Sequence, residues 1–373
     1  MSIGSVDRRT LLAGAVALGG VGPSPVEASG EPTAPFDAAV GAEAAGVRRY
    51  ATLAAAIEAA PERGAGRPWR ILVGTATLTE RLVVARPDIH LIGQSAETSI
   101  LTASAAAGDP GLDGKPLGTF GCATLIVRAP GFSARRLTIA NGFDYPAALN
   151  GARYERTGPN GAQAVALMLD KGADRSLFEQ VSVVGHQDTL FVDQGRSLFR
   201  DCRVSGSVDF IFGGGQALFE RCRIVSRARP GLQRNQGFVT APSTPRSRRF
   251  GLVFTDCALT REPGVPPASV VLGRPWRPGR AFADGHYGDP EALGAAAFIR
   301  CAMDDHISAD GWDEMGYQAR DGSRAFLEPG EARFAEFAST GPGAFHNRRR
   351  RWMTLSEAKR FTPEAVLDGW KPI

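Results

Sequence analysis

The chain has 373 residues, of which 43% are hydrophobic and 22% charged, and its formal net charge is +4 at pH 7. This composition is ordinary for a soluble globular protein. The 45 glycines and 25 prolines, with little long helical periodicity, favour many short elements joined by turns and count against a fold of long helices. The mild basicity is compatible with an anionic polymer as partner but does not by itself indicate one.

Residues 1–28 have the features of an export signal and are set apart from the fold. Arg8 and Arg9 precede an apolar run over 11–21, and 26–28 reads as a small-residue cleavage site. The run is too short to span a bilayer as a helix, and the paired arginines indicate twin-arginine export. An ordinary secretory signal or an uncleaved anchor is the alternative. We therefore expect an exported protein, periplasmic or secreted, with a linker at 29–44 and no membrane association after signal removal.

From residue 45 the sequence predicts one domain that runs to residue 373. The stretch YATLAAAIEAAP is rich in alanine and ends at Pro61, so it predicts a short N-terminal helix. Near the other end, LSEAKRFTPEAVLDGWKP has helical spacing, with Ser356 and Thr362 as the expected helix caps. We expect this C-terminal tail of helix and loop to pack on the main body or cap it.

Between these ends a short unit recurs. Its clear copies are FRDCRV from Phe199, FERCRI from Phe219, FTDCAL from Phe254 and FIRCAM from Phe298, and looser copies begin at Phe132 and Phe178. The alternation of apolar and polar residues predicts a short, half-buried strand. The copies from Phe178 to Phe219 are 21 and 20 residues apart. The next gap, of 35 residues, predicts one turn with a long loop, and the following gap, of 44 residues, predicts roughly two turns.

Copies about 20 residues apart with no helix between them predict a parallel β-solenoid over residues 45–310. In this all-β, single-domain fold, each coil adds short strands to those of the coils above and below. Chance resemblance among the strands of a β-sandwich is the alternative. Equivalent positions of neighbouring coils are stacked, so Cys202 and Cys222 are a plausible disulfide. An odd total of five cysteines leaves at least one unpaired.

Two aspartates occupy the same phase of this repeat. Asp188, in GHQDTLF, lies ten residues after Phe178, and Asp209, in GSVDFIFG, lies ten residues after Phe199. Neighbouring strands are about 4.8 Å apart, so we expect the two carboxylates side by side on one face. Two such acids do not both ionise easily: one can serve as a charged nucleophile and the other, with a raised pKa, as a general acid. For each aspartate alone, a turn cap or an ion pair with arginine is the alternative.

Four further side chains could reach the same face. Gln187 adjoins Asp188, and Gln163 lies about one coil earlier, so their amides could form an oxyanion hole. A stacked glutamine ladder is the alternative. Arg274, in LGRPW, could hold a carboxylate in a bidentate pair and keep it ionised. Trp276 beside it offers a flat apolar surface for a sugar ring, with simple packing as the alternative.

Other common catalytic patterns are missing from the sequence. It contains no GxSxG elbow, P-loop, dinucleotide fingerprint, EF-hand loop or CxxC pair. His186 lies near Asp188, but no serine is marked as its partner. The sequence therefore favours chemistry that the paired aspartates carry.

In chain order, GAQAVAL, GHQDTLF, GSVDFIFG and LGRPW are similar to motifs of the pectin methylesterase (pectinesterase) family, bacterial type. The resemblance covers about residues 45–373 and includes MDDHISADGW from Met303, RFAEFASTGPGA and the closing DGWKP. It implies a right-handed parallel β-helix, in agreement with the repeat. The family's early G-x-Y-x-E motif is replaced in this chain by GTATLTE, a departure that bears on the first strands and the edge of the cleft.

The resemblance implies a role for each matched residue. Asp209 would attack the methyl ester carbonyl of a galacturonate unit. Asp188 would protonate the departing methanol and then activate the water that opens the acyl-enzyme. Gln163 and Gln187 would stabilise the tetrahedral oxyanion, and Arg274 would hold Asp209 in position.

The same resemblance implies that Trp276, Phe191, Phe212 and Met303 contact the substrate. The implied partner is methyl-esterified polygalacturonate (pectin), with no nucleic acid, no metal and no organic cofactor, and we expect a monomer. Three alternatives stay open: an esterase for another ester, a pectin-cleaving glycosidase, and a wall-binding solenoid without activity. Two carboxylates about 5 Å apart also suit a retaining glycosidase. The amides and the arginine count against that alternative, because an oxyanion hole serves a carbonyl centre.

Overall fold

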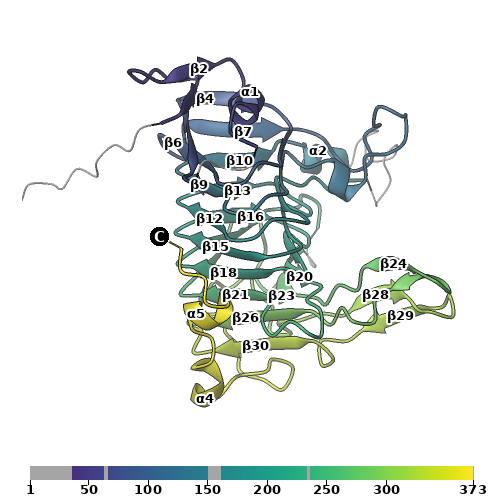
Figure 1. Cartoon of the computed structure of the whole chain (residues 1–373). Helices are drawn as coiled ribbons and strands as arrows, with labels where there is room; N and C mark the ends of the chain where they lie inside the picture. The colour runs from purple at the N-terminus through teal and green to yellow at the C-terminus, as the bar shows by residue number, and fades with distance from the viewer. Residues whose placement is uncertain (1–35, 63–65, 150–160, 233–235, 373) are drawn as a thin grey trace, which may run out of the picture. The chain divides into compact units, whose positions relative to one another are not determined.

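The structure is a computed structural model that describes residues 36–62, 66–149, 161–232 and 236–372. These residues belong to one compact unit that begins at Phe36. Successive turns of the chain stack as rungs from the purple to the yellow-green end of Figure 1. Most turns contribute a strand to each of three parallel sheets, which we call A, B and C in the order in which the chain visits them.

Within each sheet the strands pair in a fixed spatial order. In that order, sheet A contains β2 (Arg48–Tyr50), β1 (Ala38–Val40), β3 (Trp69–Val73), β6 (Ile89–Gly93), β9 (Ser133–Arg135), β12 (Ser176–Glu179), β15 (Arg196–Arg200), β18 (Gln216–Glu220), β21 (Leu252–Thr255), β26 (Ala295–Ile299) and β30 (Arg333–Phe337). Sheet B contains β27 (Ala302–Met303), β22 (Ala258–Arg261), β19 (Arg223–Ser226), β16 (Arg203–Gly206), β13 (Ser182–Val184), β10 (Thr138–Asn141), β7 (Ser99–Ala103) and β4 (Ala76–Thr79). Sheet C contains β23 (Val270–Gly273), β20 (Gly237–Pro242), β17 (Ile211–Gly213), β14 (Leu190–Val192), β11 (Leu167–Leu169), β8 (Leu125–Val127) and β5 (Leu82–Val84).

The remaining elements lie outside these sheets. They are the hairpins β24 (Gly279–Phe282) with β25 (Gly285–Gly288) and β28 (Met315–Gln318) with β29 (Arg324–Leu327), the 3-10 helix η1 (Thr119–Gly121), and the helices α1 (Leu53–Glu58), α2 (Tyr145–Leu149), α4 (Leu355–Ala358) and α5 (Pro363–Val366). Both hairpins project from the same side of the stack (Figure 1). Within the described residues, no helix has the length and apolar character needed to cross a bilayer.

The phenylalanine repeat confirms the predicted right-handed parallel β-helix. Phe178, Phe199, Phe219, Phe254 and Phe298 are successive register partners on β12, β15, β18, β21 and β26. Their rings stack inside the coil with centroids 4.5 to 4.7 Å apart and planes within 10° of parallel. Each ring is fully buried, so the repeated phenylalanine is a core position that the parallel pairing copies from coil to coil.

Three sequence expectations about this solenoid are wrong in detail. The 44-residue gap to Phe298 is one coil with a long excursion, because β26 pairs directly with β21 and the β24–β25 hairpin lies between them in the chain. The copy at Phe132 is offset by two residues, since Ala134 is the partner of Phe178. The predicted linker 29–44 contains β1, which pairs with both β2 and β3 in sheet A.

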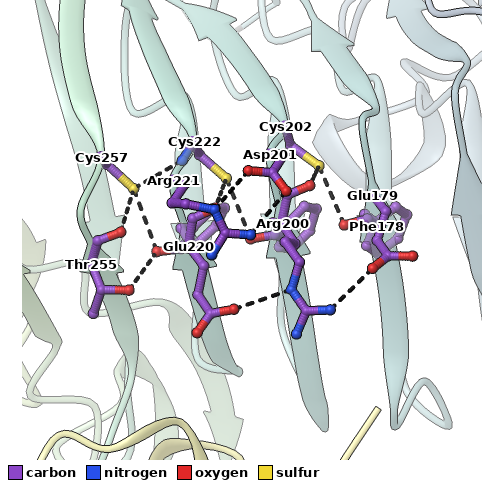
Figure 2. A network of polar contacts seen from close by, with 12 residues as sticks. Phe178, Glu179, Arg200, Asp201, Cys202, Glu220, Arg221, Cys222, Thr255 and Cys257 are labelled. Atoms are coloured by element: carbon purple, nitrogen blue, oxygen red, sulfur yellow. Dashed lines mark hydrogen bonds and ion pairs between the residues drawn. The ribbon is translucent and has the colours of Figure 1, made fainter. Parts of the chain in front are cut away.

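A single residue with positive φ makes the sharp corner between sheets A and B. Asp201, Arg221 and Asp256 occupy this position with φ of 53°, 50° and 55°. In each case the next residue is a cysteine that points into the coil, so Cys202, Cys222 and Cys257 form a ladder (Figure 2).

The ladder corrects the expected Cys202–Cys222 disulfide, because all five cysteines are free and buried. The thiol of Cys202 donates to the carbonyl of Phe178 at 3.3 Å, and that of Cys222 donates to the carbonyl of Phe199 at 3.3 Å. Equivalent side chains on in-register parallel strands point the same way, about 4.8 Å apart. A disulfide instead needs Cβ atoms that converge to about 3.8 Å.

The structure confirms the helical segments predicted at both ends of the domain. Thr52 caps α1, and the carboxylate of Glu80 accepts from the backbone N–H of Leu53 and Ala54 at the same helix end. At the C-terminus Thr362 caps α5 as expected. The predicted cap Ser356 is wrong, because it lies inside α4.

Thr354 is the residue that caps α4, and it forms a capping box with Glu357. The tail then runs back along the outside of sheet A (Figure 1). There Val366 and Leu367 pack with Leu198 and Leu218 in a second apolar cluster. The tail therefore covers an outer face of the solenoid that would otherwise expose apolar residues.

Candidate active site

The two aspartates of the repeat lie in equivalent turns between sheets B and C. Asp188 precedes β14 and Asp209 precedes β17, and the register Leu190↔Ile211 puts both two residues before a paired position. Both have positive φ, 60° and 49° respectively. The N–H of Asp188 donates to the carbonyl of Val208 at 3.0 Å, which joins the two turns directly. The structure therefore stacks the two acids on adjacent coils.

Asp209 is the more enclosed partner and carries a dedicated counter-ion. The Nε of Arg274 lies 2.9 Å from Oδ1 and Nη2 lies 2.7 Å from Oδ2, which is a bidentate ion pair. The Asp209 side chain is only 10% exposed. The Arg274 guanidinium lies 3.8 Å from the ring centroid of Phe238. The arginine and the phenylalanine ring together fix the orientation of the Asp209 carboxylate. One edge of the guanidinium donates both hydrogen bonds to this carboxylate.

The electrostatics of Asp188 differ, although it occupies the same phase. Burial raises the pKa of Asp188 well above its ordinary value, and the negative charge of Asp209 raises it further. Arg274 opposes this rise in the Asp188 pKa but does not cancel it. The pair therefore divides into a carboxylate held by arginine and a carboxyl group that tends to keep its proton, which is the division that acid and nucleophile roles need.

The two glutamines lie on neighbouring coils beside these acids. The backbone N–H of Ala164, next to Gln163, donates to the carbonyl of Gln187 at 3.1 Å. The side-chain Oε1 of Gln163 is buried and makes no hydrogen bond to the described residues. A buried acceptor without a partner is unusual, because burial of a polar atom without a hydrogen bond is unfavourable. This oxygen can accept a hydrogen bond from a ligand.

An aromatic surface adjoins the acids along sheet C. The rings of Phe191 and Phe212 lie on consecutive strands with centroids 4.6 Å apart. The Trp276 ring lies 5.8 Å from Phe212 and 6.4 Å from Phe191. Phe191 and Phe212 are almost fully buried, whereas Trp276 is partly exposed. Trp276 is thus the accessible edge of this surface, supported from below by the two phenylalanines.

A sequence profile of the Pectinesterase family matches residues 37–370. The chain belongs to the pectinesterase family. Pectinesterase A of Dickeya dadantii (strain 3937) is 40% identical over 340 residues, which cover 90% of this chain and 92% of the relative.

Solved structures of the pectinesterase family give the same result. A pectin methylesterase from Erwinia chrysanthemi superposes with a TM-score of 0.86 at 41% identity, covering 91% of this chain and 99% of that one. A pectin methylesterase in complex with a hexasaccharide gives a TM-score of 0.86 at 40% identity, with the same coverage. The family match over residues 37–370 includes the turns that carry Asp188 and Asp209.

One residue that the pectinesterase resemblance assigned to the substrate does not lie with the others. Met303 is 1% exposed and belongs to the interior core, where its sulfur lies 3.4 Å from Nη2 of Arg350. In the two-residue strand β27, Ala302 faces outward and Met303 inward. The alternation of the strand therefore places Met303 away from the surface, and its predicted substrate contact is wrong.

Sequence reasoning also missed an aromatic residue at this pectinesterase site. Phe120, in η1, lies with its ring centroid 4.9 Å from that of Phe191 and is 46% exposed. Phe120 therefore extends the aromatic surface beyond Phe191. Phe120 belongs to a connection outside the repeat, so neither strand alternation nor coil spacing could have identified it.

Proposed function

We propose that this member of the pectinesterase family hydrolyses the methyl esters of polygalacturonate, releasing methanol and leaving pectate, with Asp209 as nucleophile. The observation that carries this assignment is the pair of stacked aspartates, of which one is clamped by Arg274 and the other has a raised pKa. An ester carbonyl needs a charged nucleophile and a separate proton donor for the alkoxide that leaves. The two aspartates supply both.

In the first step the Asp209 carboxylate attacks the ester carbonyl and forms a tetrahedral intermediate. We assign the side-chain N–H groups of Gln163 and Gln187 as donors to the oxyanion, because the two glutamines lie on neighbouring coils beside the acids. As the intermediate collapses, the C–O bond to the methoxy group breaks and Asp188 donates its proton, so methanol leaves. The galacturonate acyl group stays on Asp209 as an anhydride.

In the second step Asp188, now a carboxylate, takes a proton from a water molecule that attacks the acyl carbonyl. Collapse of this second intermediate releases the galacturonate carboxylate and restores Asp209. Arg274 acts through Asp209 as a positioning residue, because its two hydrogen bonds fix the free carboxylate before it attacks. The chemistry uses side chains of the chain alone.

The aromatic surface supports a polymeric sugar substrate. Trp276 and Phe120 are its accessible members, and Phe191 and Phe212 form its base. Flat apolar faces suit the C–H faces of sugar rings, and a related pectin methylesterase has been crystallised with a hexasaccharide. We assign Trp276, Phe191 and Phe212 to substrate binding on this basis and add Phe120.

We further propose that the chain is exported to the periplasm or beyond and acts there as a monomer, without nucleic acid or membrane partners. The support is the twin-arginine pattern of residues 1–28, which lie outside the described residues. Pectin is a large extracellular polymer, so an enzyme for it has to leave the cytoplasm.

Methanol release from pectin by the purified chain tests the function, with Asp209→Asn as the decisive variant. We expect the parent to release methanol and Asp209→Asn to lose at least about 10³-fold in kcat. Asp256→Asn is the matched control, because Asp256 also forms a bidentate pair, with Arg300, but on a remote turn. Near-parental turnover in Asp209→Asn would refute the nucleophile. New reducing ends without methanol would instead support the glycosidase alternative.

A further inference from the structure

A groove runs along the corner where sheet A turns into sheet B. It has a volume of about 490 Å³, and its lining includes Arg136, Gln180, Asp201, Arg203, Arg221 and Arg223. We call it the corner groove. Arg203 is the first residue of β16, whereas Asp209 lies beyond Gly206, the last residue of that strand. The corner groove and the proposed catalytic turn therefore lie at opposite ends of the B strands.

Three of the four arginines that line the corner groove have no carboxylate partner among the described residues. Arg203 and Arg223 are register partners on β16 and β19, so their backbones are about 4.8 Å apart. The Nε of Arg223 donates to the hydroxyl of Thr260 at 3.3 Å, and the Nε of Arg136 donates to the carbonyl of Gly93 at 3.3 Å. Burial lowers the pKa of Arg203, and the charge of Arg223 lowers it further. Like charges thus face each other without a counter-ion.

The acids near the corner groove do not neutralise these arginines. Asp201 is taken up by Arg221, whose Nε and Nη2 each lie 2.9 Å from a carboxylate oxygen (Figure 2). Glu262 raises the pKa of Arg203 from a distance, but its own ion pair is with Arg227 at 3.1 Å. Glu97 also lines the corner groove, but it is exposed to water, where its charge is screened. The corner groove thus has an excess of positive charge.

We propose that the corner groove is a second, non-catalytic binding surface for de-esterified galacturonan, the polyanionic product of the proposed reaction. Guanidinium groups pair with carboxylates in bidentate geometry. Arg136 and Arg223 lie three coils apart, so the arginines span on the order of 14 Å. A linear polymer with a carboxylate on each ring can contact several of them at once. The choice of polymer rests on the proposed function, whereas the anion-binding character rests on the arginines alone.

The corner groove distinguishes product from substrate by charge. A methyl ester carries no charge and offers a guanidinium only weak acceptors, so a fully esterified chain gains little there. A partly de-esterified chain binds at the corner groove through its free carboxylates while its remaining esters stay near the catalytic face. Such bivalent attachment raises the effective concentration of the remaining esters.

The test compares a groove variant with a charge-matched control. The groove variant carries Arg203→Gln and Arg223→Gln. The control carries Arg348→Gln and Arg360→Gln, which remove two exposed arginines that form no ion pair with the described residues. The ligand is fully de-esterified polygalacturonate, and the measured quantity is its dissociation constant at low ionic strength. We expect this constant to rise roughly threefold to tenfold in the groove variant and to change less than about twofold in the control.

Unchanged affinity in the groove variant, or an equal loss in the control, would overturn the proposal. An equal loss of affinity for polyglutamate would overturn the assignment to a uronan. Both variants should release methanol from short methyl-esterified oligogalacturonides at the parental rate, and a slow groove variant would show that the groove is part of the catalytic face. A parent that binds polygalacturonate but releases no methanol would refute the proposed function and leave the corner groove standing.

Discussion

At the scale of single residues, the Arg274–Asp209 ion pair fixes the orientation of the carboxylate that we propose as the nucleophile. Arg274→Lys keeps the positive charge but cannot form two parallel hydrogen bonds to one carboxylate. We expect kcat on pectin to fall about 10²-fold, because small misplacements of a reacting group have effects of that size. KM should stay within about threefold. Steady-state kinetics with Arg300→Lys as control, at the remote Asp256 pair, separates positioning from general destabilisation. A change confined to KM would count against the positioning role.

The raised pKa of Asp188 makes a second residue-level prediction, about stability and pH. An unfolded aspartate loses its proton near pH 4, whereas folded Asp188 keeps its proton until its raised pKa is reached. Between these two values the folded state binds more protons, so stability falls as pH rises through that window. Asp188→Asn removes this term. We expect the variant to be more stable than the parent at pH 7, by an amount that grows as the pH rises from about 4.

The same Asp188→Asn difference should vanish below about pH 3.5, where both states of the parent are protonated. Urea unfolding at pH 3.5, 5 and 7 measures the stability difference between parent and variant. Asp113→Asn, at an exposed position, is the control, and its stability difference should not change with pH in this way. A stability difference that is independent of pH would mean that Asp188 is not held protonated by its surroundings. Asp188→Asn should also lose methanol release, because an amide cannot donate and recover the proton.

The residues of the site could largely be predicted, and the failures have physical reasons. The aspartates were found because the parallel register copies a position from coil to coil, which spacing in the sequence reveals. Arg274 and Trp276 followed from their motif. Met303 was assigned to the wrong side because a motif does not report which way a two-residue strand faces. Phe120 was missed because its loop has no partner in the repeat.

At the scale of elements, the stacked phenylalanines are the framework that aligns the turns carrying Asp188 and Asp209. Phe219 lies in the middle of the stack, with neighbours at 4.7 and 4.5 Å on either side. Phe219→Ala should lower the free energy of unfolding by about 3–5 kcal/mol, because it removes a fully buried ring and leaves a cavity. Phe326→Ala, at a 46% exposed position of β29, should change it by less than about 0.5 kcal/mol. Equal effects in urea titrations would show that the stack does not carry the solenoid.

Elements that share this stack were predictable, and those that leave it were not. The strands from β12 to β21 carry the phenylalanine in register, so their order follows from the sequence. The excursion that contains β24 and β25 lengthens one coil until its spacing in the sequence is close to that of two coils. Spacing alone does not distinguish an inserted hairpin from an additional coil. β1 consists of three small apolar residues without alternation, so its sequence does not predict a strand. In the structure, however, it pairs with both β2 and β3.

At the scale of the whole molecule, the interior of the coil protects four thiols, and a separate apolar cluster with Phe191 and Phe212 protects the fifth. Cys202, Cys222, Cys257 and Cys301 follow the corner residue in their coils, and Cys122 is buried against Val165 and its neighbours. Burial raises the pKa of Cys122 to about 11, and it raises the pKa of Cys222, Cys257 and Cys301 well above its ordinary value. A thiol that keeps its proton and does not reach solvent reacts slowly even in an oxidising compartment.

The folded protein should therefore show almost no reaction with an aromatic disulfide reagent at pH 8, and the same sample in denaturant should titrate all five thiols. The labelling rate of the folded protein should follow its unfolding rate, because a reagent reaches the ladder only when the coil opens. The denatured Cys222→Ser variant should titrate four thiols, which calibrates the count. Three reactive thiols in the denatured parent would mean that one disulfide forms after all, and a count of four in Cys222→Ser would then show that Cys222 is one of its two cysteines. Rapid labelling of the native parent would show that the solenoid opens locally on the timescale of the reagent, contrary to the continuous stacking seen from Phe178 to Phe298.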